Sequence, residues 1–587
     1  MSRSLQINWL DCEKAPADFL GQLPGVHPLV MQVLWARGLR DAATAGCFLA
    51  DVPDDADPFA LPDMRIAVDR ILRAIGGGEP IAVYGDYDCD GVTACALLND
   101  VLSLLKANAR IYIPDRFEEG YGLNSAALDR LKADGVGLVV TVDCGARAMG
   151  EARHAREIGL DLVVTDHHEL EDGEIPDACA VINPRRSGSI YPFKFLAGVG
   201  VAYRLAQALL RSAADPGAGA GQAAPSAYEE TLLDLVAIGT VADVVPLIGE
   251  NRCLVRAGLR RINTQPRLGV RHLAAAASVK IGTATAQSIG FAMGPRLNAA
   301  GRIETARDAF DLLTVSDESI AHQIAGRLNQ RNDQRQQITA SVARSAEHLA
   351  FVDGDSPLLF AASEDYNPGV IGLAAARLVE KFYRPAIVVS THMGEARGSC
   401  RSVEGFHITA ALDQCKDLLA RHGGHAAAAG FSTPAVSLAE LHKRLVEIAA
   451  AQQPDGGWAR ALPVDAEINL YKLSMETYTQ LQRLEPHGMG NPRPNFAARG
   501  AILYSIRRVG KVHPPAEGAA PEQPPHLQLR LKDAKGASWE AIGWRMGERA
   551  PGLALGAKID VLFQLDINEW NGESKLQLVI QDLRVVQ

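Results

Sequence analysis

Three aspartates alternate within one short stretch, Gly85-Asp86-Tyr87-Asp88-Cys89-Asp90-Gly91, directly after an apolar run that ends at Tyr84. In an extended strand alternate side chains point to the same face, so the three carboxylates would lie together. Ionised carboxylates that close repel one another and are not buried without a cation to neutralise them. The stretch therefore predicts one half of a metal site.

The acidic stretch has two other interpretations. Asp-x-Asp-x-Asp-Gly also opens the calcium-binding loop of an EF-hand, and aspartate-rich turns are often only solvated loops. An EF-hand requires a glutamate at loop position twelve, which is Leu97 when Asp86 is position one. The segment before the loop is also typical of a strand, whereas an EF-hand begins with a helix. A plain turn stays open as the alternative.

The elements that would position the acids alternate between strand and helix from about residue 79. We expect strands at 81–84, 111–113, 138–142, 162–165 and 180–182, and helices at 92–105, 125–131 and 149–158. This alternation predicts a doubly wound parallel sheet. In such sheets ligands collect beyond the carboxyl ends of the strands.

Further chemical groups follow those predicted strand ends. Asp143 follows the third strand and Asp166-His167-His168 follows the fourth, while a helix predicted from Glu229 to Val241 delivers Asp243. Because neighbouring residues in an extended chain point in opposite directions, we expect one histidine to bind metal and the other to reach the substrate. All these groups are expected at one edge of the sheet.

The donor types indicate which metal would bind. Carboxylates with one or two imidazoles favour Mg²⁺ or Mn²⁺, and the nine cysteines include no Cys-x-x-Cys pair of the kind that holds zinc. We interpret Cys89 and Cys144 as small apolar fillers, because a thiolate would add more negative charge. So many acids can hold two ions, which clamp a phosphodiester for hydrolysis.

Composition and length indicate a multidomain globular protein. Its 587 residues exceed the size at which single cores stop growing, and 47% of them are hydrophobic. No apolar run is long enough to span a bilayer and the N-terminus lacks the apolar core of a signal peptide, so we expect a cytoplasmic protein without membrane partners. The formal net charge of −10 means that any contact with nucleic acid depends on local basic patches.

The chain order predicts five regions. They are a helical N-terminal segment (1–60), the metal-binding α/β domain (61–315), a connecting helix (316–352), a second α/β domain (353–455) and a small β-barrel (456–587). The five strands expected in the barrel are residues 501–506, 527–531, 539–543, 559–565 and 576–579. A flexible insertion is expected at 215–225. A proline-rich loop, residues 514–525, is expected to interrupt the barrel.

Several basic or glycine-flanked groups are candidates for binding phosphate. Arg302 lies in a segment expected to be a glycine-bounded loop, 294–302, and Arg401 lies in an expected turn, 397–402. A helix is expected from 407 to 421. Gly424 and His425 belong to the glycine-rich segment 423–430 that follows it, whose backbone amides could approach a ligand closely. On the barrel, a basic cluster without acids predicts single-strand binding: Arg499, Arg507, Arg508 and Lys511.

Five motifs carry a resemblance to the DHH phosphoesterase superfamily. They are Asp86–Gly91, Val142–Gly145, Asp166–His168, Gly239–Pro246 and Gly423–His425. Within the superfamily the chain is most similar to the bacterial RecJ family of single-strand-specific exonucleases, from about residue 60 to 450. The segment Leu484–Pro492 resembles the start of that family's oligonucleotide-binding domain.

This resemblance implies a metal-dependent 5′-to-3′ exonuclease that releases mononucleotides from single-stranded DNA during recombination and repair, with a helicase and a single-strand-binding protein as plausible partners. It implies that two Mn²⁺ or Mg²⁺ ions are held by Asp88, Asp90, Asp143, His167 and Asp243. Asp86 would lie close to these ligands, Asp166 would support the site, and His168 would face the scissile phosphate. Arg302, Ser399, Arg401, Gly424 and His425 would hold the nucleotide.

The sequence departs from the family pattern at three positions. Cys400 stands where relatives usually have glycine and could crowd the backbone, Cys89 stands where alanine is common, and Tyr84 replaces a histidine of smaller relatives. Two other functions stay open. One is a DHH phosphodiesterase acting on short oligoribonucleotides or cyclic dinucleotides, and the other is a non-catalytic nucleic-acid-binding scaffold.

Overall fold

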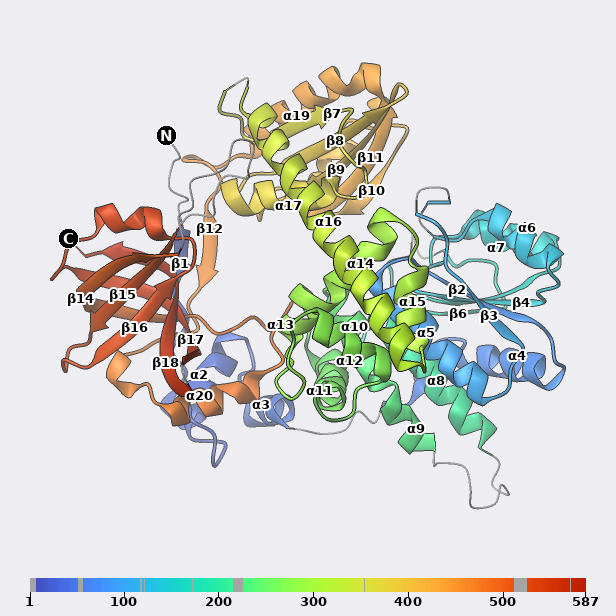
Figure 1. The fold of residues 1–587 in the computed structure, drawn as a ribbon, viewed down its shortest axis with the longest axis horizontal. Coiled ribbons are helices and arrows are strands. Elements are labelled where there is room, and N and C mark those ends of the chain that lie inside the picture. The colour runs from blue at the N-terminus through green and yellow to red at the C-terminus, as the bar shows by residue number, and fades with distance from the viewer. Residues whose placement is uncertain are drawn as a thin grey trace. The chain divides into compact units, whose positions relative to one another are not determined.

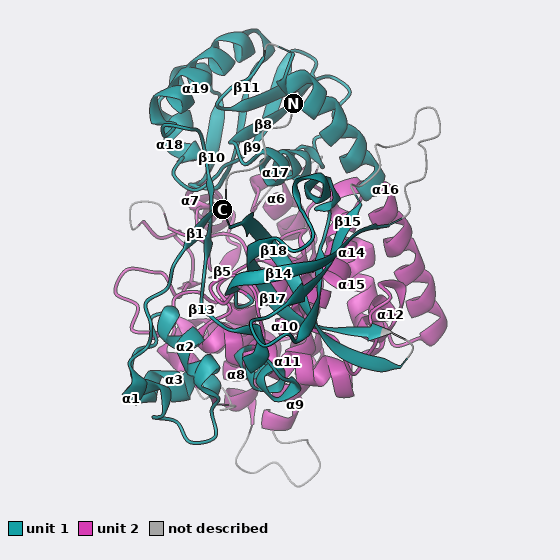
Figure 2. Cartoon of the chain, turned by 90° about the vertical axis from the view of Figure 1, so that its left-hand side faces the viewer, with its two compact units in different colours: residues 1–49, 336–484, 493–587 teal, residues 50–335, 485–492 magenta. Residues whose placement is uncertain are grey.

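The structure is a computed structural model that describes residues 7–50, 56–116, 119–120, 122–170, 174–214, 225–352, 354–510, 525–570 and 572–586. The chain divides into two compact units (Figure 2). Unit 1 comprises residues 1–49, 336–484 and 493–587, and unit 2 comprises residues 50–335 and 485–492. Most of the expected insertion at 215–225 and of the proline-rich loop at 514–525 lies outside the described residues.

Unit 2 contains a five-stranded sheet in which every pair of neighbours is parallel (Figure 1). Its strands are β2 (Ile81–Gly85), β3 (Ala109–Tyr112), β4 (Leu138–Val142), β5 (Asp161–Thr165) and β6 (Ala180–Ile182), in the order β3-β2-β4-β5-β6. The strand predictions therefore match to within two residues at each end. The parallel order confirms the expected sheet class.

Helices cover both faces of this sheet. Helices α4 (Met64–Gly76), α5 (Cys89–Leu104) and α8 (Gly198–Ala213) share a core with one set of strand residues, including Val83 and Val140. Helices α6 (Ser125–Ala133) and α7 (Met149–Glu157) share a separate core with the alternate set, including Ala82 and Val139. The sheet is thus doubly wound, because alternate strand residues face opposite layers.

The second half of unit 2 is helical. It contains α9 (Pro225–Thr231), α10 (Leu233–Ala242), α11 (Gly249–Thr264), α12 (Leu268–Ala276), α13 (Ala286–Ser288), the π-helical turn η2 (Ile289–Met293), α14 (Gly294–Ile303) and α15 (Arg307–Thr314). The single helix expected from 229 to 241 is wrong, since it is divided between α9 and α10.

The glycine-bounded loop expected at 294–302 is also wrong, because this segment is helix α14. Proline is tolerated in the first turn of a helix, where its missing N–H leaves no bond unmade, and Pro295 occupies that turn. Leu297 and Ala300 then bury one face of the helix in the core. The glycines and proline were therefore misleading signals of a loop.

Helix α16 (Glu318–Ala350) follows α15 and confirms that the expected connecting region is one long helix. Its 33 residues span about 50 Å at 1.5 Å per residue. Residues 318–335 belong to unit 2 and residues 336–350 to unit 1.

Unit 1 contains a mixed five-stranded sheet in the order β10-β11-β9-β8-β7. Its elements are β7 (Leu359–Ser363), α17 (Ile371–Phe382), β8 (Ala386–His392), β9 (Glu395–Arg401), α18 (Ile408–Asp413), the 3₁₀ turn η3 (Lys416–Leu418), β10 (Arg421–His425), β11 (Ala428–Pro434) and α19 (Leu438–Gln452). Only the β7–β8 pair is parallel within this sheet.

Two further predictions fail in this sheet. The turn expected at 397–402 is mostly strand β9, whose residues alternate between buried and exposed. The glycine-rich segment at 423–430 forms the hairpin of β10 and β11, and the helix expected from 407 to 421 ends at Asp413.

The remaining part of unit 1 is a closed barrel of five strands. These are β14 (Phe496–Val509), β15 (His526–Lys532), β16 (Ser538–Gly543), β17 (Lys558–Trp570) and β18 (Glu573–Val585), and the pairing of β14 with β17 closes the barrel. The short strand β13 (Ala466–Glu467) extends it beside β14, and helix α20 (Met475–Leu481) precedes it. All five predicted barrel strands are confirmed.

The N-terminal segment packs with the barrel. Strand β1 (Ile7–Leu10) pairs with β12 (Arg460–Pro463), and helices α1 (Ala17–Leu20), α2 (Pro28–Ala36) and α3 (Ala42–Leu49) bury apolar side chains in the same core as the barrel strands. Among the described residues, none of the helices has the length and apolar composition needed to cross a bilayer.

Candidate metal centre

The acidic stretch forms a strand, a loop and a helix start, not a continuous strand. Strand β2 ends at Gly85, Asp86 lies in the loop, and Asp88 is the N-cap of α5, with Oδ1 accepting hydrogen bonds from the N–H groups of Asp90 and Gly91. The expectation that a strand aligns the three carboxylates is therefore wrong. Side-chain capping of the helix, which a strand pattern does not consider, sets their directions.

Glycine is required where the helix meets the loop. A Cβ on Gly91 would lie 2.6 Å from the backbone oxygen of Asp86, so any other residue would displace the loop. Asp90 lies in the first turn of α5, and its carboxylate accepts hydrogen bonds from the N–H groups of Gly198 and Val199 at the start of α8. Asp90 thus ties α8 to the acidic loop in addition to facing the site.

The other acids also lie at element ends. Asp143 follows β4 and Asp166 follows β5, while Asp243 is the C-cap residue of α10. Asp143 has a φ of +60° and Val244, directly after Asp243, has a φ of +63°. This left-handed conformation is strained for residues other than glycine, and such strain concentrates at functional sites.

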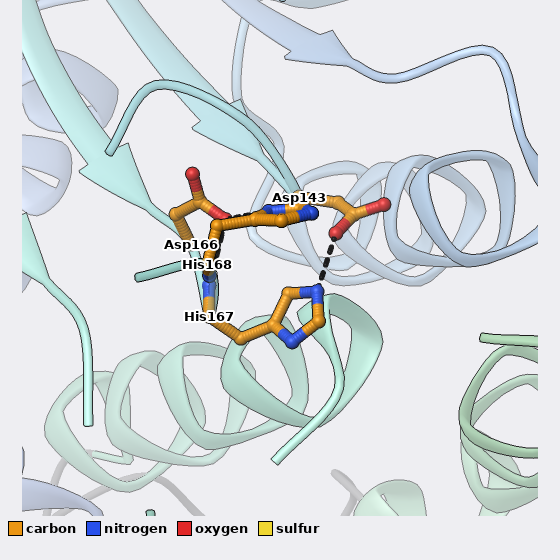
Figure 3. Close-up of side chains that lie close together, drawn as sticks. All are labelled: Asp143, Asp166, His167 and His168. Carbon is orange, nitrogen blue, oxygen red and sulfur yellow. Dashed lines mark hydrogen bonds and ion pairs between the residues drawn. The ribbon is translucent and has the colours of Figure 1, made fainter. Parts of the chain in front are cut away.

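These element ends bring the predicted groups together (Figure 3). His167 Nε2 lies 3.1 Å from Asp143 Oδ1 and 3.6 Å from Asp243 Oδ2. Three sets of residues each offer ligand atoms within 4.8 Å of one another: Asp86, Asp88 and Asp143; Asp90, His167 and Asp243; and Asp143, Asp166, His167 and His168. The structure therefore gathers all eight sheet-edge groups predicted from the sequence.

Four acids of this cluster, Asp86, Asp90, Asp143 and Asp243, have too little positive charge near them to offset their burial. Burial, together with the charge of the neighbouring Asp88, raises the pKa of Asp86 to about 8 and that of Asp90 to about 7. Burial and adjacent carboxylates also raise the pKa of Asp143 and Asp243 well above the usual range. Carboxyl groups this close together need a cation beside them to remain ionised at neutral pH.

Unused acceptors show that the cluster fits divalent cations. Asp86 Oδ1, Asp143 Oδ1 and Asp243 Oδ2 are buried, and none of the described groups donates a hydrogen bond to them. A buried acceptor without a donor is costly unless a cation or water fills the place. The oxygen-rich donor set with one imidazole suits Mn²⁺ or Mg²⁺.

The two histidines differ in their partners. Burial, together with the charge of His168, lowers the pKa of His167 to about 3, so His167 is neutral with ring nitrogens suited to a metal. Burial also lowers the pKa of His168, but the hydrogen bond and charge of Asp166 outweigh it and the net shift is upward. His168 Nδ1 lies 2.7 Å from Asp166 Oδ1.

The expectation that the two imidazoles point in opposite directions is wrong. Their ring centroids are 4.4 Å apart and both rings belong to the same cluster. The alternation rule does not apply, because β5 ends at Thr165 and the histidines lie in the loop after it. Asp166 fixes this loop, since its Oδ1 accepts from the N–H groups of His167 and His168 and its Oδ2 from that of Ala146.

Helix α14 carries Arg302 close to Tyr87 in the acidic loop. It also contacts this loop through Asn298 and Gly301, to which the sequence assigned no role. Asn298 Oδ1 accepts a hydrogen bond of 2.8 Å from the N–H of Cys89, and a Cβ on Gly301 would lie 2.7 Å from the backbone oxygen of Tyr87. The guanidinium of Arg116 lies 5.1 Å from the centre of the Tyr87 ring. Arg116 was not among the groups predicted from the sequence. Its position after strand β3, at the same edge of the sheet, is the signal that could have identified it.

The phosphate-binding candidates of unit 1 share one face of its sheet. Arg401 on β9 pairs in register with Ala428 on β11, which pairs with His425 on β10. Ser399 is two residues before Arg401 on the same face, and Arg401 Nη1 lies 3.3 Å from Ser399 Oγ. Gly424, next to His425, has a φ of +146°, and a Cβ there would lie 2.4 Å from the Ala428 oxygen.

The departure at Cys400 does not crowd this face. The Cys400 side chain is fully buried and packs in the core between the sheet and its helices. Because neighbours in a strand point oppositely, it lies on the face away from Ser399 and Arg401. Cys89 and Cys144 are likewise buried, and burial raises the pKa of each thiol well above its usual value, as expected for apolar fillers.

The basic cluster expected on the barrel is only partly present. Arg507 and Arg508 are exposed on β14, and Lys511 lies outside the described residues. Arg499 is surrounded by acids, with Asp560, Asp11 and Glu467 within 3.6 Å of its guanidinium. The expectation of an acid-free cluster is therefore wrong at Arg499, because distant parts of the chain bring these acids to it.

Comparison with known families matches three domain models. Residues 80–240 match the DHH family N-terminal domain, residues 355–451 the DHHA1 domain, and residues 464–582 the RecJ OB domain. The chain is similar to the single-stranded-DNA-specific exonuclease RecJ of Bacillus subtilis strain 168, with 38% identity over 95% of this chain and 68% of that protein.

Two solved structures are similar over nearly the whole chain. RecJ from Thermus thermophilus in complex with Mn²⁺ has 29% sequence identity and a TM-score of 0.80, covering 99% of this chain and 80% of that one. The same protein in complex with Mg²⁺ has 29% identity and a TM-score of 0.76, covering 99% and 79%. The ions in both structures are those that the donor set of this chain suits.

Proposed function

The chain belongs to the RecJ family, and we propose that it is a metal-dependent exonuclease that hydrolyses single-stranded DNA to 5′-mononucleotides in the 5′-to-3′ direction, in recombination and repair. One observation carries the chemistry. Acids and an imidazole from four separate segments converge on unpartnered, buried carboxylate oxygens. This arrangement supports a site for two divalent cations.

Each group near the cluster has a proposed task. Asp88, Asp90, Asp143, His167 and Asp243, with Asp86 beside them, would hold two Mn²⁺ or Mg²⁺ ions. When bound, the ions polarise the phosphodiester and favour attack by water and departure of the leaving oxygen. Asp166 holds His168 through the hydrogen bond at Nδ1 and raises its pKa, so that the protonated ring would donate from Nε2 to a phosphate oxygen.

The remaining candidates would bind the strand. Arg302, Ser399, Arg401, Gly424 and His425 would hold the nucleotide, since guanidinium groups and backbone amides suit phosphate oxygens. Arg507 and Arg508, which are exposed on the barrel, would contact phosphates of the DNA strand beyond this nucleotide. Lys511 is a further candidate for these contacts. A helicase and a single-strand-binding protein would supply the substrate in the cytoplasm.

End-labelled digestion tests this proposal. In Mn²⁺ the wild-type protein should release labelled mononucleotide first from the 5′ end of a single strand and should leave a blunt duplex intact. Asp143→Asn should remove hydrolysis while binding of the strand persists, because the strand contacts lie elsewhere. Release from the 3′ end would refute the polarity, and equal digestion of the duplex would refute the single-strand preference.

A further inference from the structure

Three large apolar side chains of unit 2 are exposed around the segment that contains Asp243. Val244, Phe291 and Met489 expose 60%, 82% and 55% of their surface. Together they are called the apolar shelf below. Val244 lies within residues 241–247, and the backbone segments that carry Phe291 and Met489 contact those residues.

Two contacts place Phe291 and Met489 at this segment. Phe291 lies in η2, which packs on the last turn of α10, because a Cβ on Gly290 would lie 3.6 Å from Val241 Cγ1 and one on Gly294 would lie 3.2 Å from Ala242 Cβ. Residues 485–492 also belong to unit 2. Within them, the Met489 oxygen accepts a hydrogen bond of 2.7 Å from the N–H of Leu247.

The backbone of the shelf is unusual at two points. Val244 has a φ of +63°, a conformation that a β-branched residue adopts only at a cost, and its exposed side chain gains little packing in return. Phe291 lies in a π-helical turn, and such turns are frequent at functional sites. Backbone strain that is not offset by side-chain packing is typical of functional sites, and here it indicates a role in binding.

We propose that the apolar shelf binds an unpaired nucleobase of the strand, next to the phosphate that is hydrolysed. The proposal rests on the function proposed above. Val244 follows Asp243 directly, so the two Cα atoms are about 3.8 Å apart and the shelf begins beside a proposed metal ligand. A base that enters the metal centre therefore has an apolar surface available close to it.

The shelf explains two properties of the proposed substrate. Every nucleobase has an apolar π face, so stacking on Phe291 gives affinity without preference for sequence. In a duplex that face is covered by the neighbouring base pairs, and the pairing must be broken before it is available. The shelf is thus a specificity-determining surface that favours single strands.

Abasic substitution tests the contact. The substrates are a 5′-phosphorylated oligothymidylate and versions with one abasic unit at each of the first four positions, digested in Mn²⁺. For the wild type, the abasic unit at one position should lower kcat/KM by roughly 5- to 140-fold, the range for one stacked base. Phe291→Ala should lower kcat/KM on the unmodified strand by a similar factor, mainly through KM, and should be insensitive to that abasic unit.

Two variants complete the experiment. Phe291→Trp should retain both the activity and the abasic sensitivity of the wild type, because it keeps an aromatic face. Leu104→Ala is the matched control, since Leu104 is 49% exposed at the far end of α5, about 21 Å along the helix from Asp90. It should behave as the wild type.

The outcomes separate the two proposals. If the wild type does not digest the unmodified strand, the proposed function fails and the shelf fails with it. If the wild type digests it but Phe291→Ala has unchanged kcat/KM, or keeps the wild-type sensitivity to abasic units, the shelf alone is refuted.

Discussion

Asn298 Oδ1 accepts a hydrogen bond of 2.8 Å from the N–H of Cys89, which joins helix α14 to the first turn of α5. The donor belongs to a buried residue between two proposed metal ligands. Asn298 therefore holds the loop that carries Asp86 and Asp88, although it offers no ligand to the ions itself.

Replacement of this residue should loosen the acidic loop. Asn298→Ala leaves the N–H of Cys89 buried without an acceptor, so the free energy of unfolding should fall by about 1–3 kcal/mol and kcat should fall with it. Urea unfolding and nuclease kinetics in Mn²⁺ measure the two effects. Asn263→Ala is the control, because Asn263 Oδ1 also accepts backbone N–H groups, from Gly282 and Ala284, outside the cluster. It should lose stability but keep kcat, and equal losses of kcat in both variants would contradict a positioning role for Asn298.

The stabilisation of the protein by Mn²⁺ should increase with pH between about 6 and 8. In the metal-free protein the pKa of Asp90 is raised to about 7 and that of Asp86 to about 8, against about 4 when unfolded. A carboxyl with a raised folded pKa loses stability as pH rises through that range, because the folded state must give up a proton that the unfolded state has already lost. A divalent cation replaces those protons and removes the loss.

Thermal melting with Mn²⁺ or with EDTA, at about pH 6 and about pH 8, measures this effect. The difference in Tm between the two conditions should be larger at the higher pH, and Asp143→Asn should reduce it at both. The pKa of His167 is about 3, so this histidine does not titrate in the window. A difference in Tm that is the same at both pH values would contradict the expectation.

Local patterns predicted the chemistry of the site better than its geometry. The alternating aspartates correctly indicated carboxylates that gather, but the strand geometry was wrong because Asp88 caps α5 and turns the chain. For the same reason the rule of alternating directions failed at His167 and His168, which follow the end of β5. Side-chain hydrogen bonds to the backbone override periodicity at element ends.

Long-range contacts were beyond the reach of any local pattern. The acids that surround Arg499 come from residues as distant as Asp11, so a basic cluster in sequence is not one in space. Residues 485–492 match the RecJ OB domain model, as expected, but they pack in unit 2, where Gly488 and Gly490 lie close to Leu247 and Pro246. The strands of the parallel sheet, in contrast, were predictable because they are short apolar runs, such as β2 and β4, that are buried throughout. The barrel strands were predictable because their burial largely alternates, as in β15.

Gly372→Ala should weaken nucleotide binding without weakening the fold. Gly372 lies in the first turn of α17, and a Cβ there would lie 2.8 Å from Ser399 Oγ and 3.1 Å from Arg401 Nη2. The added methyl group displaces these two side chains, so KM should rise several-fold while Tm stays within a few degrees, since alanine favours the helix. Gly326→Ala in α16 is the control, because a Cβ there meets open space. A rise in KM for both variants would contradict the role of Ser399 and Arg401.

The salt dependence of strand binding should locate the barrel contacts. Deletion of everything after residue 460 is not a clean test, because it also removes the contact of Met489 with Leu247, close to Asp243. The paired replacement Arg507→Ala and Arg508→Ala changes only exposed side chains on β14. Removal of one arginine–phosphate ion pair should reduce the slope of log K against log salt concentration by about 0.7, so removal of two should reduce it by about 1.4.

Arg499 supplies the matched control on the same strand. Its guanidinium lies 3.2 Å from both Asp560 and Asp11, so its charge is already compensated in the free protein. Arg499→Ala should therefore leave the slope unchanged, as measured by fluorescence anisotropy of a labelled single strand in Ca²⁺ between low and moderate salt. If Arg499→Ala reduces the slope as much as the paired replacement does, exposure of an arginine does not determine whether it binds phosphate. The specific contacts proposed for Arg507 and Arg508 would then be wrong.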